Sequence, residues 1–212
     1  MTGANRVSPL SRAAVTVALA LGLAAGGCAS LPTRDADARW AHPKLSLNSY
    51  IEHGDLVTLV VGTRPAYVRR DKAYMGVEFA VANNGLDQLT VSREGFSLLD
   101  DQGRQFPAVG PEELREAGYS VDLDRRLGEV LPVLLDRFQS YSFVPSNLTP
   151  GFVDPVERSP VELQRFSWTY GFLYFPYPTE QTGVQRYELQ FDAPELEDPI
   201  VVRFLLQRRS PS

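Results

Sequence analysis

Cysteine and histidine are scarce in this sequence. Its 212 residues include a single cysteine, Cys28, so no disulfide can form within the chain. The two histidines, His42 and His53, have no serine or free cysteine partner in a recognisable catalytic pattern. No G-x-S-x-G, H-E-x-x-H, P-loop or G-x-G-x-x-G motif occurs. We therefore expect a protein that is not an enzyme and that uses no cofactor.

Metal-binding patterns are also missing. A pair of His42 and His53 is one conceivable site, but both positions fit exposed turn residues better. Asp122 and Asp124 have the spacing of a calcium loop. Arg126, however, stands where a third oxygen ligand is needed, and the glycine that such a loop requires is absent. We expect no metal site.

Clustered positive charge is a third absence. The chain has 21 Lys and Arg against 26 Asp and Glu, a formal net charge of -5, and its basic residues are scattered. Nucleic acids and anionic lipid headgroups select clustered Lys and Arg, so we expect neither as a main partner. Apolar residues make up 43% and charged residues 22%, which together with the length suits one globular domain.

No apolar run is long enough to span a bilayer, which takes about 20 residues. The longest, residues 13–25, is uncharged and follows a segment that carries Arg6 and Arg12. A positive segment followed by a short apolar one is typical of a secretory signal peptide. Loss of this segment would lower the formal net charge from -5 to -7, because Arg6 and Arg12 leave and no acid does.

The apolar run ends in Leu23-Ala24-Ala25-Gly26-Gly27-Cys28. This segment resembles the lipobox of bacterial lipoproteins, with Ala25 where Leu is most common. The resemblance implies cleavage before Cys28, diacylglycerol on its sulfur and acylation, for example by palmitate, of the new N-terminus. Ala29 follows the cysteine, and the absence of Asp there favours the outer membrane, on its periplasmic face, in a Gram-negative cell. We expect a cell-envelope protein that is anchored to the membrane through Cys28.

Three segments follow from this pattern. Residues 1–27 are the expected signal peptide, residues 28–44 are the lipidated cysteine with a flexible tether, and residues 45–212 form a single domain. The tether is rich in charge and proline and lacks apolar periodicity. Trp40 is its exception, and we expect it either to dock on the domain or to lie at the membrane interface.

The domain is mainly β in pattern. Residues 74–82 alternate so that Met75, Val77, Phe79 and Val81 share one face of a strand. Further short strands, separated by polar turns, are expected over residues 45–47, 56–61, 89–91, 96–99, 104–107, 141–144, 184–191 and 200–206. This spacing of short strands predicts a β-sandwich.

Residues 111–138 break the β pattern. Pro111 begins a short helix, and apolar residues then recur at helical spacing from Leu123 to Phe138. Pro132 is expected to kink this second helix. We expect a helical insertion that covers an open end or edge of the sandwich.

Two strand motifs extend this picture. Val77-x-Phe79-x-Val81-x-Asn83-Asn84-Gly85 and Phe96-x-Leu98-x-Asp100-x-x-Gly103 resemble the small immunoglobulin-like sandwich domains of uncharacterised bacterial lipoproteins. The resemblance covers about 30 residues and does not include the helical insertion. It implies an immunoglobulin-like β-sandwich with a binding or structural role.

Aromatic residues alternate along residues 166–174 at the positions Phe166, Trp168, Tyr170, Phe172 and Tyr174. Two interpretations stay open: a buried inner face of the sheet, or an exposed platform for sugar, peptide or partner protein. The small residues between them favour the buried interpretation, because they suit the outward face. If the surface is exposed, the candidate binding residues are Trp168, Tyr170, Tyr174 and Tyr177.

The expected function is a lipid-anchored, non-enzymatic binding or scaffolding module in envelope assembly or maintenance. Its partners would be the membrane, through Cys28, and another envelope protein or peptidoglycan. The alternatives are an envelope hydrolase that acts on glycan or peptide through unidentified carboxylates, and a carrier of lipid or another apolar ligand. Two buried carboxylates facing each other in a cleft beside the aromatics would favour the hydrolase.

Overall fold

The computed structural model describes residues 39–146, 148, 160–177 and 183–208. The expected signal peptide and Cys28 lie outside these residues, so the lipid anchor stays a prediction. The described residues belong to one compact unit that begins at Asp37. Trp40 and His42, which we assigned to the tether, are therefore part of this unit.

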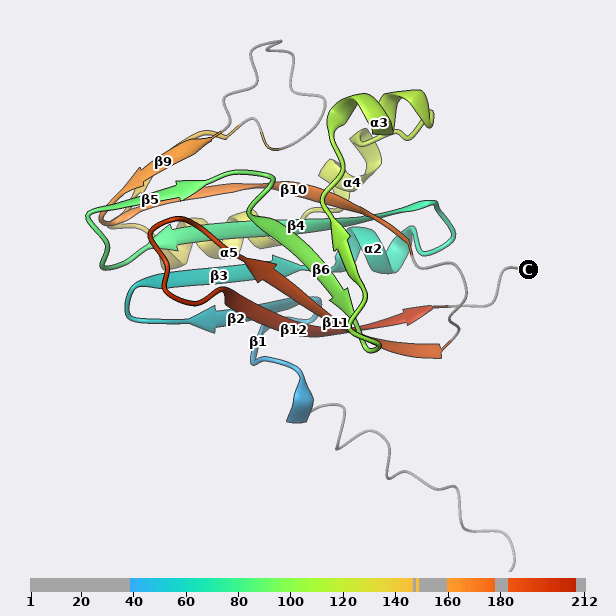
Figure 1. The fold of residues 1–212 in the computed structure, drawn as a ribbon, viewed down its shortest axis with the longest axis horizontal. Coiled ribbons are helices and arrows are strands. Elements are labelled where there is room, and N and C mark those ends of the chain that lie inside the picture. The colour runs from blue at the N-terminus through green and yellow to red at the C-terminus, as the bar shows by residue number, and fades with distance from the viewer. Residues whose placement is uncertain (1–38, 147, 149–159, 178–182, 209–212) are drawn as a thin grey trace, which may run out of the picture. The chain divides into compact units, whose positions relative to one another are not determined.

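The described residues are mainly β and form three sheets (Figure 1). The six-stranded sheet has the order β1 (Lys44–Ser46), β2 (Ser49–His53), β3 (Val57–Gly62), β4 (Tyr74–Asn83), β10 (Ser167–Pro176) and β8 (Ser142–Phe143). The four-stranded sheet has the order β12 (Ile200–Arg208), β11 (Gly183–Phe191), β6 (Phe96–Asp100) and β7 (Gln105–Pro107). The third sheet pairs β5 (Gln88–Val91) with β9 (Val161–Gln164). β8 runs parallel to β10, and the other pairs of described strands are antiparallel.

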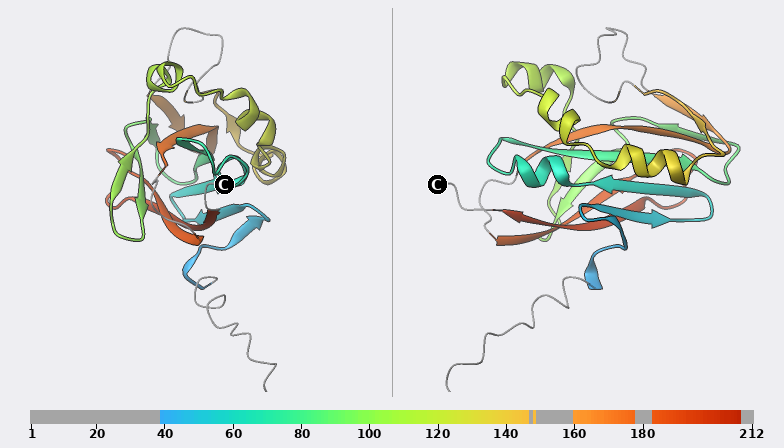
Figure 2. Two further views of the ribbon diagram at one scale, coloured as in Figure 1. Left: turned by 90° about the vertical axis from the view of Figure 1, so that its right-hand side faces the viewer. Right: turned by 180° about the vertical axis from the view of Figure 1, so that it is seen from behind.

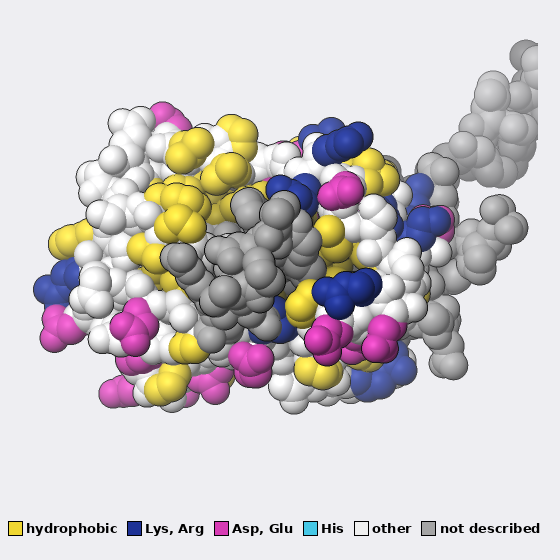
Figure 3. Space-filling view, turned by 90° about the horizontal axis from the view of Figure 1, so that it is seen from above, with side chains coloured by type: hydrophobic (Ala, Val, Ile, Leu, Met, Phe, Trp, Pro, Cys, Tyr) yellow, Lys and Arg dark blue, Asp and Glu magenta, His cyan; other side chains and the backbone are white. Residues whose placement is uncertain are grey.

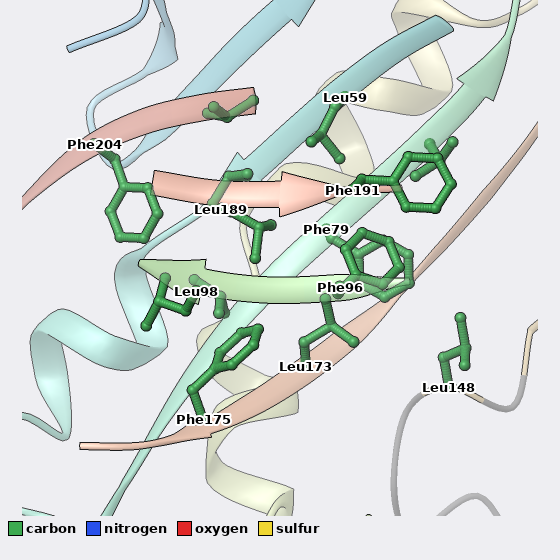
Figure 4. Packing of buried hydrophobic residues seen from close by; sticks show 14 of the residues in the cluster. Leu59, Phe79, Phe96, Leu98, Leu148, Leu173, Phe175, Leu189, Phe191 and Phe204 are labelled. Atoms are coloured by element: carbon green, nitrogen blue, oxygen red, sulfur yellow. The ribbon is translucent and has the colours of Figure 1, made fainter. Parts of the chain in front are cut away.

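The main hydrophobic core lies between the two larger sheets (Figure 4). The predicted alternation along β4 is confirmed, since Met75, Val77, Phe79 and Val81 are all 0% exposed within this core. The ring of Phe96 lies 4.8 Å from that of Phe79 and 4.7 Å from that of Phe191, measured between centroids. Aromatic packing of this kind joins β4 to β6 and β11 and holds the sheets together.

The helical insertion is confirmed, and its last helix covers a face of the six-stranded sheet, whereas we expected the insertion to cover an end or edge. It consists of α3 (Pro111–Glu116), α4 (Asp122–Leu127) and α5 (Val130–Arg137). Seen from behind, α5 and the separate short helix α2 (Arg64–Val68) lie across the sheet face that is turned away from the four-stranded sheet (Figure 2). We call this face the outer face. It carries apolar side chains, among them Ala80, Ala82 and Trp168, which pack against Val130, Leu134 and Phe138 of the insertion.

The second helix of the insertion does not kink at Pro132. The structure instead has two helices, α4 and α5, which are separated at Gly128 and Glu129. Pro132 lies in the first turn of α5, where a missing backbone N–H removes no hydrogen bond within the helix. Within the described residues, no helix is both long enough and apolar enough to cross a membrane.

Candidate functional site

The aromatic residues of β10 are largely covered by the helical insertion. Trp168 is 2% and Tyr174 1% exposed, and Tyr170 is half-buried. Tyr177, which is 4% exposed, packs into the core between the sheets. Trp168, Tyr174 and Tyr177 therefore do not form the exposed platform that the sequence left open, because α5 and its neighbours or the second sheet lie over them.

The residues between these aromatics are buried as well. Ser167 is 3% and Thr169 0% exposed, and Leu173 and Phe175 on the same face of β10 lie in the core between the sheets. The expectation that the small residues face outward is wrong, since β10 lies between a second sheet on one face and helices on the other.

A buried carboxylate, Glu78 of β4, ties α5 to the outer face. Glu78 is 0% exposed. Its Oε2 accepts the backbone N–H of Glu129 at 2.9 Å, and its Oε1 accepts the backbone N–H of Val130 at 3.3 Å and the Tyr170 hydroxyl at 2.7 Å. Burial raises the pKa of Glu78, and the hydrogen bonds offset this only in part. The carboxylate thus satisfies the unpaired N–H groups at the start of α5, where the helix dipole favours negative charge.

A second buried carboxylate, Asp124 of α4, pairs with Arg69, which follows α2. The Arg69 Nη1 lies 2.9 Å from the Asp124 Oδ2, and the side chains are 9% and 0% exposed. The guanidinium also lies 4.1 Å from the centre of the Tyr119 ring. Burial raises the pKa of Asp124, and the charge of Arg69 opposes that rise. This ion pair joins α2 to α4.

Around this ion pair, Asp124 Oδ1, Arg69 Nε and the Tyr174 hydroxyl make no hydrogen bond of ordinary geometry. The Tyr119 and Tyr174 hydroxyls nevertheless lie close enough to Asp124 to oppose the rise of its pKa. Both carboxylates are closed off from solvent and engaged with internal groups. Such an arrangement can fix the helices on the sheet, whereas general acid or base catalysis needs a carboxyl within reach of a substrate.

A different set of aromatics remains exposed where β9 leads into β10. Phe166 is 53% exposed and Phe143, on the edge strand β8, is 48% exposed. The Phe166 ring lies edge-on to Tyr141 with centroids 5.5 Å apart, and the Phe143 ring lies 4.8 Å from that of the buried Trp168. We call Tyr141, Phe143 and Phe166 the aromatic edge.

The backbone of Phe166 has φ 59°, the left-handed conformation that a bulky residue rarely adopts. Two hydrogen bonds hold it there: its N–H donates to Asn83 O at 2.8 Å, and its carbonyl accepts the Ser142 N–H at 2.9 Å. Strain of this kind costs about 1–3 kcal/mol and collects at functional sites. Sequence reasoning missed this conformation, because glycine or asparagine usually marks it.

Apolar side chains also gather toward one side of the molecular face in Figure 3, and acidic side chains lie mostly along the opposite border.

The two histidines take separate structural roles. His53 Nδ1 hydrogen-bonds to the Thr58 hydroxyl at 2.8 Å. His42 Nδ1 accepts the backbone N–H of Arg203 at 2.8 Å. Among the described residues, no group of three or more His, Cys, Asp or Glu could hold a metal ion.

Comparisons with known proteins give two structural likenesses. No protein-family model matches the chain, and no curated protein matches it. The candidate lipoprotein ycdA of Bacillus subtilis is 17% identical with a TM-score of 0.39, over 74% of this chain and 38% of that one. The yjhA protein of Bacillus subtilis is 12% identical with a TM-score of 0.38, over 79% of this chain and 98% of that one. The chain thus spans 38% of the length of ycdA and nearly all of yjhA.

Proposed function

We propose that this chain is a lipid-anchored cell-envelope protein whose domain binds a partner protein through the aromatic edge. The observation that carries the proposal is the Phe166 ring, which a left-handed backbone holds 53% exposed. The fold gains little from this arrangement, since the backbone is strained and half of the ring stays in water. Binding would explain both costs, because aromatic side chains are the usual anchors of protein interfaces.

The position of the aromatic edge supports a protein partner. Phe143 belongs to β8, the last strand of the six-stranded sheet. Both residues of β8 are exposed. A sheet edge that no other described strand covers, flanked by half-exposed rings, suits an extended segment of another protein, which could pair with the edge and bury the rings. Peptidoglycan, whose sugars also stack on aromatic rings, is the alternative ligand.

A non-enzymatic role is the second part of the proposal. Glu78 and Asp124 are the buried carboxylates beside the aromatic residues, and both are 0% exposed. Glu78 binds backbone groups and Tyr170, and Asp124 binds Arg69. Their partners are all internal, which supports a structural role and disfavours the hydrolase. The immunoglobulin-like character of the sandwich belongs to the proposal too, supported by two sheets that face each other across one core.

The envelope location rests on the lipobox-like segment 23–28. Two or more acyl chains at Cys28 would anchor the protein stably, whereas one chain binds a membrane only marginally. From Cys28 to Trp40, where the chain reaches the domain, an extended backbone spans at most about 40 Å. The partner would then lie within this distance of the membrane, plus the length of the domain.

Site-specific photocrosslinking in intact cells tests the proposal. A photoreactive amino acid is placed at Phe143 or Phe166, and at Leu47 as a control that is 79% exposed in the β1–β2 turn. We expect a discrete envelope-protein product from positions 143 and 166 and none from 47. The product from position 143 should disappear when Phe166 is replaced by Ala. Equal products from all three positions, or none from the aromatic edge, would contradict the proposed surface.

Replacement of Cys28 by Ser tests the anchor separately. We expect the Cys28→Ser chain to leave the membrane fraction while it keeps the folded domain. Continued membrane association with cleavage at the same place would contradict the lipobox interpretation.

A further inference from the structure

The chain enters the domain alongside β12, the edge strand of the four-stranded sheet, and one histidine makes the connection. The backbone N–H of His42 donates to Arg203 O at 2.9 Å, and the Arg203 N–H donates to His42 Nδ1 at 2.8 Å. His42 therefore supplies both a donor and an acceptor to the edge of β12, as a residue of a paired strand would. Its side chain takes the place of a backbone carbonyl.

Charged groups from three strands surround this histidine. Glu52 of β2 places its Oε2 3.1 Å from His42 Nε2. Arg203 of β12 and Glu188 of β11 form an ion pair beside it, with Nε 3.0 Å from Oε1. Next to this group, Arg186 of β11 lies over the Trp40 ring, 5.4 Å from its centre. Residues 40–42 are thus fastened to the domain by a stacked ring and a histidine.

The hydrogen bonds select one form of the imidazole. Nδ1 must be unprotonated, because it accepts the Arg203 N–H, and Nε2 must then carry the proton that faces Glu52. A second proton could only go to Nδ1. It would turn the acceptor into a donor that points at another N–H group, so the bond to Arg203 would be lost.

We infer that His42 is a proton-operated latch that holds residues 40–42 against β11 and β12 when the imidazole is neutral and releases them when it is doubly protonated. The latch itself does not depend on lipidation. Its consequence, a longer and looser link between Cys28 and the domain, rests on the proposed function.

The shift in the pKa of His42 gives the direction in which docking depends on pH. Burial lowers the pKa of His42, the charge of Arg203 adds to this, and Glu52 and Glu188 offset it only in part. A pKa that is lower in the docked state means that docking favours the neutral form. The latch therefore holds fully above the ordinary histidine pKa of about 6.5 and weakens as the pH falls through the lower, docked value.

Hydrogen exchange of the full-length protein in detergent micelles tests the latch. Amide protection of residues 40–42 is measured between about pH 8 and about pH 5, on either side of the ordinary histidine pKa, and corrected for intrinsic exchange. We expect protection to be lost toward the acid end, because the docked state disfavours the doubly protonated imidazole. Peptides from β4 serve as the internal reference and should keep their protection.

Two variants separate the latch from other titrating groups. His42→Asn retains an acceptor near the position of Nδ1 but does not titrate, so its protection should be the same across the pH range. His42→Ala lacks the acceptor, so the amides of residues 40–42 should exchange rapidly at every pH.

Equal protection of the native protein at both ends of the pH range would overturn the latch. An unchanged pH response in His42→Asn would also overturn it, and would assign that response to Glu52 or Glu188. A Cys28→Ser chain should show the same pH dependence of amide protection as the native protein. The test of the latch is therefore independent of whether the lipid anchor exists.

Discussion

The Tyr170 hydroxyl donates a 2.7 Å hydrogen bond to the Glu78 carboxylate, joining β10 to β4 beneath the helical insertion. The same carboxylate receives two backbone N–H groups at the start of α5. One buried acid therefore connects both central strands to the helix that covers them.

Tyr170→Phe should destabilise the domain by about 1.5–3 kcal/mol, because the variant removes a hydrogen bond to a buried charged group. Urea unfolding monitored by circular dichroism measures the difference. The matched control is Tyr67→Phe, on a residue that is 42% exposed. That change should stay within about 0.5 kcal/mol, as is usual for surface positions. Equal effects at the two tyrosines would contradict the role assigned to Tyr170.

The free energy of unfolding should depend on pH in part through the titration of Glu78. Its pKa is raised by burial in the folded state, relative to about 4.3 when unfolded. The folded state therefore binds the proton more tightly, and the contribution of Glu78 to stability is fully present below the unfolded pKa. That contribution decreases as the pH rises through the raised, folded value.

Glu78→Gln removes this titration and provides the comparison. The free energy of unfolding of the native protein minus that of Glu78→Gln should fall as the pH rises from about 4 toward neutrality. Urea titrations at several pH values measure both quantities. A difference that is constant with pH, or that grows, would show that the folded pKa of Glu78 is not raised.

Trp168 and Phe166 should respond in opposite ways to truncation although they are two residues apart. Trp168→Ala removes a side chain that is 2% exposed and packed against α5, and should cost about 3–5 kcal/mol. Phe166→Gly relieves a left-handed backbone that costs a non-glycine residue roughly 1–2 kcal/mol, so its folded state should be nearly as stable as the native one. Thermal unfolding checks both changes.

The two variants also separate folding from binding. Phe166→Gly should retain a native melting curve and lose the photocrosslink from position 143. A large loss of stability in Phe166→Gly would mean that the ring is part of the core after all.

Gly128→Ala should destabilise the insertion through steric overlap alone, because the backbone of Gly128 has φ -55°, which any residue adopts. A methyl group there would lie 2.7 Å from Glu78 Oε1 and 3.1 Å from the Tyr170 hydroxyl. We expect a loss of about 1–3 kcal/mol, as for other overpacked sites. Gly110→Ala, whose added methyl meets nothing nearer than 3.8 Å, is the control and should cost about 1 kcal/mol or less.

The strands of the domain were predictable where large apolar residues on the core face alternate with small or polar residues on the other face. β4 shows this, since Met75, Val77, Phe79 and Val81 alternate and all reach the core. β10 was not predictable in the same way, because most of its large aromatic side chains lie on the outer face beneath the helices, and alternation alone does not say which layer covers which face. Its Ser167 and Thr169 looked like outward residues and are buried.

The residues of the candidate site could not be recognised from their neighbours in the sequence, because residues from distant strands determine their conformation and contacts. Phe166 adopts a left-handed backbone because Asn83 and Ser142 hold it from other strands. His42 looked like a linker residue, and only the tertiary fold brings Arg203 and Glu52 to it. The helical periodicity of the insertion was correct, but the break lies at Gly128, where the backbone comes close to Glu78 of a distant strand.

The pairing of β4 with β10 also constrains how the chain is assembled. Glu78 and Tyr170 are 92 residues apart in the sequence, so the strands that carry them cannot meet until most of the polypeptide has been delivered. Pairing between such distant segments slows folding, because a long loop must close before its contacts stabilise it. Until then Val130, Leu134 and Phe138 of the insertion lack Trp168, the ring against which they pack, and a chain secreted across a membrane would present these apolar side chains to its surroundings. Assembly on the far side of that membrane would therefore gain from chaperones that shield apolar segments until β10 arrives.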